Sequence, residues 1–132
     1  LNMDKNIIFL DPIFGDAKSS AYHAADFIAI PSLIDAMTII APEAACCKKP
    51  VLYTNTCDFS ELSKNGGGIE VDPSVSSIKK GLVLMINSDR FSMGEKGYNY
   101  VIENYDWKNL AFQYINVFKS VIHDTSIVGS IK

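Results

Sequence analysis

Two carboxylates lie eight residues apart, between two apolar segments of the chain. Asp35 follows the apolar segment 27–30, and Glu43 precedes the apolar segment 50–53. A carboxylate accepts several hydrogen bonds, so two carboxylates in one place can hold the hydroxyl groups of a polar ligand. Each also has a structural alternative, Asp35 as a loop or N-cap residue and Glu43 as a solvated residue of a helix.

The segments around these carboxylates predict a βαβ unit. A strand at 27–30 leaves through Pro31 and Ser32, a short helix carries Glu43, and a second strand follows at 50–53. This order places both strands parallel in one sheet. Ligands of open α/β sheets bind outside the carboxyl ends of the strands, beside the helices that follow. We therefore expect Asp35 and Glu43 to face one crevice.

The rest of the chain predicts one α/β domain, 1–132, with a Rossmann-like parallel sheet and flanking helices. The segment 6–10 is nearly all apolar, which predicts a buried strand. Apolar positions of the last helix, 107–122, form one stripe that we expect in the core. The remaining predicted elements are a helix capped by Asp16, a helical turn at 58–63, a strand at 69–71, helices at 74–87 and 90–104, and Asp106 as the cap of the last helix.

Composition excludes several classes of protein. A chain of 132 residues that is 48% hydrophobic supports one domain with a core. The net charge is −3 and Arg90 is the only arginine, so we expect no nucleic-acid partner. Three cysteines without CxxC spacing indicate a reduced, cytoplasmic protein, and no apolar run approaches the roughly 20 residues of a membrane span. Because the sequence opens on Leu1 directly before an apolar segment, we expect it to be part of a longer chain.

Several motifs together resemble the group 1 glycosyltransferases, nucleotide-sugar-dependent enzymes of the GT-B fold. Each motif alone is weak, but their order and spacing are specific, and the resemblance covers about 6–122. The motifs are Tyr22-His23-Ala24-Ala25-Asp26, Ile30-Pro31-Ser32, Asp35-x7-Glu43-Ala44, Lys49-Pro50-Val51, the glycine-rich segment 66–73, Arg90-x2-Met93-Gly94 and Tyr105-Asp106-Trp107.

The resemblance implies that this chain is the later part of a C-terminal, donor-binding lobe. The implied donor is a nucleoside diphosphate sugar. Its sugar would be transferred with retention of the anomeric configuration, as in hexosyltransferases. A saccharide or lipid-linked acceptor binds the N-terminal lobe, in some relatives at the inner face of a membrane. No metal or cofactor is expected. The basic segment that clamps the diphosphate is not in this sequence, and no lysine is expected near the crevice, so the chain alone should not catalyse.

The resemblance also implies roles for individual residues. Glu43 would accept hydrogen bonds from the ribose hydroxyls, and Asp35, shorter than the glutamate of the family, would contact the transferred sugar. Ala36 and Thr38 replace glycines of a loop whose backbone meets the diphosphate. The remaining implied positions are Met37 and Ile39 in that loop, Pro12 and Ile13 at the nucleobase, and Glu61 near the donor pocket.

Other residues have structural interpretations. Lys48 replaces a glycine after the short helix, where a left-handed lysine would cost on the order of 1 kcal/mol. Cys46 and Cys47 are expected to be core thiols, and His23 a surface or half-buried side chain. Two alternatives to an active transferase remain open at this point: a degenerate GT-B lobe that binds without transfer, and a flavodoxin-like binding or signalling domain.

Overall fold

A three-stranded parallel sheet lies at the centre of the computed structural model, which describes residues 4–36 and 38–123. The strands stand side by side in chain order: β1 (Ile28–Ile30), β2 (Val51–Thr54) and β3 (Gly68–Val71). Ile28 is opposite Val51, and Val51 is opposite Gly68. The predicted parallel βαβ unit is confirmed, with each strand within one residue of its expected start and end.

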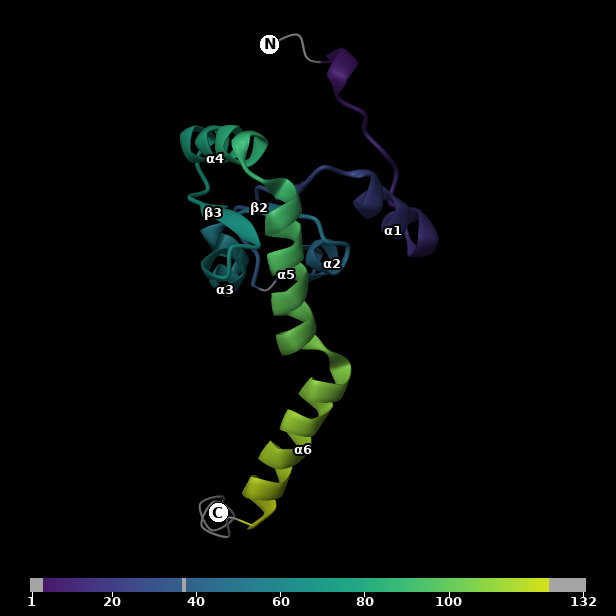
Figure 1. The fold of residues 1–132 in the computed structure, drawn as a ribbon, viewed down its shortest axis with the longest axis vertical. Helices are drawn as coiled ribbons and strands as arrows, with labels where there is room; N and C mark the ends of the chain where they lie inside the picture. The colour runs from purple at the N-terminus through teal and green to yellow at the C-terminus, as the bar shows by residue number, and fades with distance from the viewer. Residues whose placement is uncertain (1–3, 37, 124–132) are drawn as a thin grey trace.

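Helices cover both faces of this sheet (Figure 1). On one face, buried residues of α2, α3 and α5 form one cluster with Val51 and Tyr53. On the other face, α4 approaches so closely at Gly81 that its backbone lies against the side chains of Leu52 and Val71. The helices are α1 (Gly15–Ala24), α2 (Ile40–Cys46), α3 (Ser60–Lys64), α4 (Val75–Asn87), α5 (Arg90–Tyr105) and α6 (Trp107–His123), with short 3-10 turns at Asp4–Asn6 and Asn55–Cys57.

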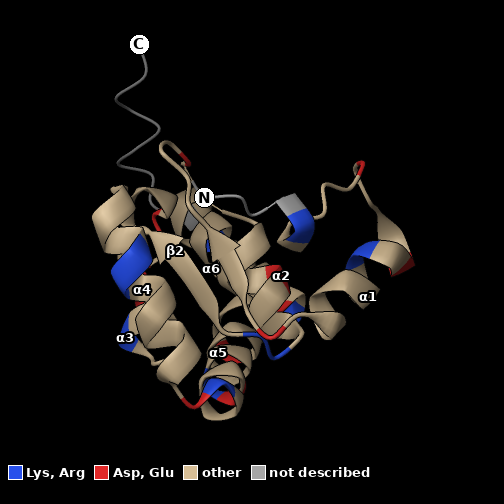
Figure 2. Cartoon of the chain, turned by 90° about the horizontal axis from the view of Figure 1, so that it is seen from above, with Lys and Arg blue, Asp and Glu red and all other residues tan. Residues whose placement is uncertain are grey.

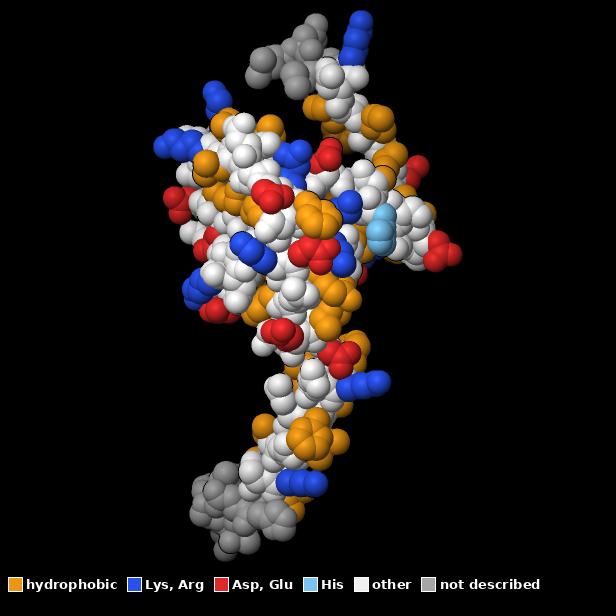
Figure 3. Space-filling model, in the orientation of Figure 1, with side chains coloured by type: hydrophobic (Ala, Val, Ile, Leu, Met, Phe, Trp, Pro, Cys, Tyr) orange, Lys and Arg blue, Asp and Glu red, His pale blue; other side chains and the backbone are white. Residues whose placement is uncertain are grey.

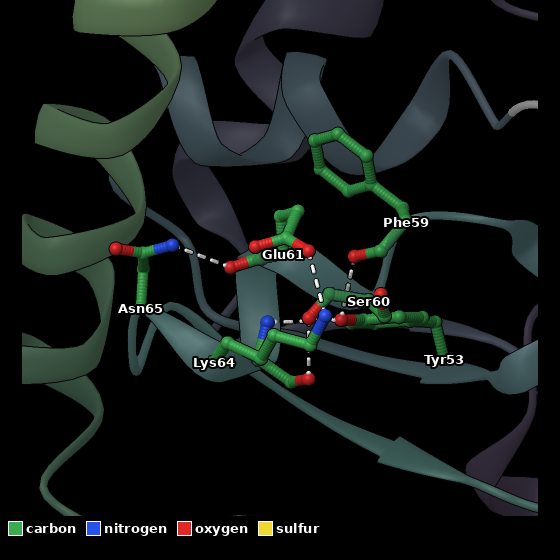
Figure 4. Close-up of polar contacts among 7 residues, drawn as sticks. Tyr53, Phe59, Ser60, Glu61, Lys64 and Asn65 are labelled. Atoms are coloured by element: carbon green, nitrogen blue, oxygen red, sulfur yellow. Dashed lines mark hydrogen bonds and ion pairs between the residues drawn. The ribbon is translucent and has the colours of Figure 1, made fainter.

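The central strand β2 is buried along its whole length, as its continuous apolar sequence predicts. The Tyr53 hydroxyl still finds polar partners: it donates to the carbonyl oxygen of Phe59 at 2.9 Å and accepts from the Ser63 amide at 3.0 Å (Figure 4). Gly67, between α3 and β3, is in backbone contact with Gly97 of α5. A methyl group at Gly67 would overlap the Gly97 backbone. These contacts fix α3 and α5 against the sheet.

The N-terminal segment differs from the prediction. Residues 7–10 form no strand, and their side chains are 51–92% exposed. An apolar segment becomes a buried strand only beside a neighbouring strand, and within the described residues the sheet ends at β1. The predicted helix cap is also wrong: Phe14 is the N-cap of α1 and has no side-chain cap hydrogen bond. Asp16 instead lies in the first turn, where its charge favours the helix dipole.

Helix α6 begins as predicted but is not buried as predicted. The Asp106 carboxylate accepts from the amides of Lys108 and Asn109, at 3.0 and 3.4 Å, which confirms the cap. The helix then extends away from the sheet, and its apolar side chains lie on the surface (Figures 1 and 3). Trp107 is 82% exposed and Phe118 is 61% exposed. Periodicity correctly groups these side chains on one face, but it does not say what packs on that face.

Candidate functional site

An open groove of about 860 Å³ runs along α2, between α1 and the junction of α5 with α6. Its lining includes Thr38 and Ile39, from the loop between β1 and α2 in which the sequence predicts a ligand site. Figure 2 shows α1 beside α2 and set apart from α3 and α4. Polar side chains on its walls include Lys18, Tyr22, Thr38 and Glu43, and apolar ones include Phe14, Val101, Tyr105, Trp107 and Leu110.

Glu43 is the centre of the polar contacts in this groove. The Lys18 ammonium lies 2.7 Å from each carboxylate oxygen of Glu43, and the Tyr22 hydroxyl donates to Oε2 at 2.8 Å. Lys18 and Tyr22 are four residues apart on α1, so both project from one face of that helix toward α2. The carboxylate of Glu43 on α2 is thus held by two hydrogen-bond donors from α1, on the opposite wall of the groove.

The electrostatics of the groove keep Glu43 ionised. Burial raises the pKa of the Glu43 carboxyl, but the hydrogen bonds from Lys18 and Tyr22 and the charge of Lys18 outweigh it, so the pKa falls below its ordinary value. Burial and the hydrogen bond to Glu43 raise the pKa of Tyr22, so its hydroxyl stays protonated and donates. At neutral pH the groove therefore contains one anion and one cation in contact.

The loop between β1 and α2 is anchored at both ends. The carbonyl oxygen of Ser32 accepts from the Thr54 hydroxyl at 2.6 Å and from the Thr56 hydroxyl at 2.8 Å; Thr54 is the last residue of β2 and Thr56 lies in the 3-10 turn after it. At the other end, the Thr38 amide donates to the carbonyl oxygen of Cys57 over 3.4 Å. The Thr38 side chain is only 3% exposed, yet its hydroxyl has no hydrogen-bond partner in the described chain.

Comparison with known proteins identifies the family of the chain. The family described as "Glycosyl transferases group 1" matches residues 1–88, two thirds of the chain. The chain belongs to the group 1 glycosyltransferases. It is 29% identical over 123 residues to an uncharacterized glycosyltransferase of Methanocaldococcus jannaschii, covering 90% of this chain and 32% of that protein. It is 27% identical over 125 residues to a D-inositol 3-phosphate glycosyltransferase of Corynebacterium urealyticum, covering 92% of this chain and 29% of that protein.

A solved structure supports the fold. Sucrose-phosphate synthase from Thermosynechococcus elongatus superposes with a TM-score of 0.80 at 18% identity, covering 92% of this chain and 31% of that one. The architecture is that of the C-terminal lobe of a GT-B glycosyltransferase, as the motifs predict. The flavodoxin-like alternative is therefore wrong. The chain spans about a third of the length of the relatives it matches.

Within this glycosyltransferase lobe, the structure brings together only some of the predicted site residues. Glu43, Thr38 and Ile39 line the groove, whereas Asp35 does not. Glu61 lies on α3, where its carboxylate pairs with Lys64 at 2.6 Å (Figure 4). Met37 lies outside the described residues. Three more predicted residues are not among those that line the groove, and their roles stay predictions: Pro12, Ile13 and Ala36.

Lys18 is the site residue that sequence reasoning missed. The expectation that no lysine lies near the crevice is wrong, because Lys18 is in contact with Glu43. The two residues are 25 positions apart, and nothing in the local pattern links them. The available signal was the spacing of Lys18 and Tyr22, which puts a cation and a phenol on one face of a helix directly preceding the βαβ unit.

The adjacent cysteines Cys46 and Cys47 also differ from the prediction that they are core thiols. Cys46 is exposed and Cys47 is half-buried, and both line the groove instead of the core. Helix α2 buries one face with Ala41, Ala44 and Ala45, and its other face, which carries Glu43 and Cys46, lines the groove. Burial raises the pKa of both thiols, so they remain protonated at neutral pH. Lys48 does adopt the expected left-handed backbone, with φ of 56°, and His23 is exposed, as one of its two interpretations had it.

The described part of the chain contains neither a cluster of metal ligands nor a membrane-spanning helix. Within residues 4–36 and 38–123, no three His, Cys, Asp or Glu side chains are grouped as metal ligands would be. No helix among these residues has the length and apolar character needed to cross a membrane.

Proposed function

We propose that this chain is the nucleotide-sugar-binding lobe of a retaining glycosyltransferase of the hexosyltransferase type. The nucleotide of the donor lies in the groove, and Glu43 accepts hydrogen bonds from the two ribose hydroxyls. The observation that carries this proposal is the ionised, half-exposed carboxylate of Glu43 on the wall of a groove large enough for a nucleotide. A carboxylate suits a diol because each of its oxygens can accept from one hydroxyl.

Donor binding has a consequence for Lys18. A carboxylate offers about four lone-pair positions, and Lys18 and Tyr22 together make three contacts with Glu43. Two ribose hydroxyls need two positions, so one of these three contacts must be given up when the ribose binds, and we propose that it is one of the two made by the Lys18 ammonium. The released ammonium then remains in the groove as a positive charge beside an anionic ligand.

The rest of the donor is assigned by the family resemblance. We propose that Pro12 and Ile13 contact the nucleobase, that the backbone of 36–39 contacts the diphosphate, and that Asp35 contacts the transferred sugar. Glu61 is assigned only a place near the donor pocket. Transfer then depends on stabilising the departing nucleoside diphosphate electrostatically. The acceptor, a saccharide or a lipid-linked sugar, belongs to the N-terminal lobe, and peripheral contact of the complete enzyme with the inner face of a membrane is part of the proposal.

A lobe that binds nucleotide without supporting transfer is the second candidate. The observation that favours it is the separation of Asp35 from the groove that Glu43 lines. The two candidates differ in one measurable respect. Within the complete enzyme, a transferase lobe supports formation of a glycoside on the acceptor with release of the nucleoside diphosphate, and an Asp35→Asn variant loses both products; a lobe that only binds gives neither product in either form.

Calorimetric titration with UDP, GDP and ADP tests the shared part of the proposal. One of the three should bind, and Glu43→Gln should weaken it about 10- to 100-fold, as expected for a charge-assisted bond of roughly 1.5–3 kcal/mol. Glu95→Gln is the matched control, because Glu95 also pairs with a lysine, Lys48, at 2.8 Å, but lies outside the groove. Equal affinities for the two variants, or no binding at millimolar nucleotide, would refute the proposal.

A further inference from the structure

Tyr22 connects the two walls of the groove through three separate contacts. Its hydroxyl donates to Oε2 of Glu43 at 2.8 Å. Its ring packs against the buried core cluster, although helix α1 itself has no buried residue. The Lys18 ammonium lies 5.9 Å from the centroid of the same ring, a distance at which a cation and an aromatic ring attract each other. These contacts restrict the position of the Tyr22 side chain from three directions.

The two carboxylate oxygens of Glu43 differ in how many donors they already have. Oε2 accepts from the Tyr22 hydroxyl at 2.8 Å and from the Lys18 ammonium at 2.7 Å. Among the described residues, Oε1 has the Lys18 ammonium as its one side-chain donor, also at 2.7 Å. Each carboxylate oxygen offers about two lone-pair positions, so Oε2 is filled and Oε1 has one position open. A diol that places one hydroxyl on each oxygen therefore requires one donor to leave Oε2.

We infer that Tyr22 is a positioning residue for Glu43, because it stays on Oε2 when the ribose binds while Lys18 leaves that oxygen. This inference rests on the proposed function of the groove. Each carboxylate oxygen then has one donor from the protein and one ribose hydroxyl: Lys18 remains on Oε1, and Tyr22 remains on Oε2. The Tyr22 hydroxyl thereby fixes the direction in which the carboxylate of Glu43 meets the diol.

The two donors on Oε2 differ in how easily they move. The Lys18 side chain is long and 39% exposed, so its ammonium exchanges a protein contact for water with little change in free energy. Tyr22 has only two side-chain torsions, and its ring would lose its packing on the core if the hydroxyl moved away. Burial and the hydrogen bond to Glu43 also raise the pKa of Tyr22, so the hydroxyl keeps its proton and remains a donor at neutral pH.

Removing the diol from the ligand tests this role of Tyr22. Whichever of UDP, GDP and ADP binds the unsubstituted chain is titrated beside its 2′,3′-dideoxy form, also with Tyr22→Phe and Lys18→Met. The preference for the ribose form over the dideoxy form should fall about 5- to 10-fold in Tyr22→Phe, because Glu43 loses the donor that orients it. The dideoxy form should bind Tyr22→Phe normally. Lys18→Met should keep the preference or increase it, since Lys18 has to leave Oε2 in any case.

The pKa of the Glu43 carboxyl, measured by NMR without ligand, gives a second readout. Burial raises this pKa, and the hydrogen bonds from Lys18 and Tyr22 lower it, so it should rise in Tyr22→Phe. Tyr98→Phe is the matched control. The Lys48 ammonium lies 5.0 Å from the centroid of the Tyr98 ring, but Tyr98 is not among the residues that line the groove. Its substitution should leave the pKa of Glu43 and the preference for ribose unchanged.

Different outcomes separate a failure of this inference from a failure of the proposed function. The inference is overturned if Tyr22→Phe keeps the full preference for ribose, if it weakens both forms by the same factor, or if Lys18→Met lowers the preference as much. An unchanged pKa of Glu43 in Tyr22→Phe also overturns it, because the hydroxyl would then not act on the carboxylate. If the unsubstituted chain binds none of the diphosphates, or binds the ribose and dideoxy forms equally, the proposed function itself fails, and this inference fails with it.

Discussion

The body of the molecule and helix α1 are held in place by different kinds of contact. The sheet with α2, α3 and α5 is held by close packing: β2 is buried along its length, and glycine backbones touch between elements. Helix α1 has no buried residue at all. Its attachment consists of the bonds from Lys18 and Tyr22 to Glu43 and the partial packing of Tyr22 on the core.

This difference places the proposed site at the boundary between a rigid and a loosely held part. Apolar packing in a core is costly to disturb, whereas exposed ion pairs contribute little and exchange readily with water and ligands. Elements that respond to ligands generally come from the less stable parts of a protein. If this comparison is correct, substitutions in the body should cost global stability, and substitutions at Glu43 should release α1 alone.

The largest effect is expected at Gly94, where α5 crosses the end of α2. A methyl group there would overlap the carbonyl oxygen of Lys48, which is backbone and cannot turn aside. Gly94→Ala should therefore lower the free energy of unfolding by about 3 kcal/mol, the upper part of the range for overpacking. Urea denaturation measures this loss.

Gly15 provides the comparison position in α1. It also has an unusual backbone, with φ of 54°, but a methyl group there would meet nothing within 4 Å. Gly15→Ala should cost only the local strain of a left-handed alanine, about 1 kcal/mol, and this cost should appear in α1 and not in global unfolding. A Gly15→Ala variant as unstable as Gly94→Ala would show that α1 is part of the packed body.

The next effect concerns the buried hydroxyl of Tyr53. Tyr53→Phe leaves the amide of Ser63 without its acceptor and removes one of the two donors to the carbonyl oxygen of Phe59, which also accepts from the Leu62 amide at 3.1 Å; the loss should be about 2 kcal/mol in urea denaturation. Tyr114→Phe is the control, because Tyr114 is 60% exposed on α6 and its loss of a hydroxyl should change stability very little. Similar values for the two variants would contradict a tightly packed body.

The parts predicted well from sequence are those that local chemistry decides. The βαβ unit follows from two apolar segments around a short helix, and the left-handed backbone of Lys48 follows from its place after that helix. Residues 7–10 and the stripe of α6 were predicted wrongly for a single reason. Apolar composition shows that a segment favours burial, but burial also needs another surface, and the described residues do not supply it.

Of the residues that line the groove, the sequence analysis named Glu43, Thr38 and Ile39, which all belong to one motif. Glu43 lines the groove, as its motif led us to expect, because one short helix determines its position. The contact of Glu43 with Lys18 was missed because it joins two helices 25 residues apart, and only the tertiary arrangement brings them together. The unsatisfied hydroxyl of Thr38 has no sequence signature either, since the lack of a partner is a property of the folded surroundings.

A smaller global effect with a clear local signature is expected at Glu43. Glu43→Gln removes the charge that holds Lys18, so amide exchange of 15–24 should become faster, while global stability changes by less than about 1 kcal/mol. Glu95→Gln removes the similar ion pair with Lys48 in the body and should leave exchange in α1 unchanged. Unchanged exchange in Glu43→Gln would mean that packing, not the ion pair, holds α1.

The same contact should depend on pH. The pKa of the Glu43 carboxyl is lowered in the folded chain, so its stabilising contribution is fully present above the ordinary glutamate pKa of about 4.3 and is lost as the pH falls through the lower, folded-state pKa. Trp107 is the only tryptophan and lines the same groove. Its fluorescence should therefore change on acidification below about pH 4, and this change should be absent in Glu43→Gln.

The smallest effect is expected at two adjacent lysines of the body. Lys48 has a left-handed backbone with φ of 56°, whereas Lys49 is not among the residues of positive φ. Replacing Lys48 by glycine relieves backbone strain of about 1 kcal/mol. It also raises the conformational entropy of the unfolded chain and removes the ion pair with Glu95, and both of these effects lower stability. These contributions nearly cancel, so Lys48→Gly should change stability by less than about 0.5 kcal/mol.

Lys49→Gly has no strain to relieve and should cost about 1 kcal/mol. Equal losses in the two variants would mean that the left-handed turn after α2 carries no strain, and the close contact at Gly94 would then be the main constraint on this junction.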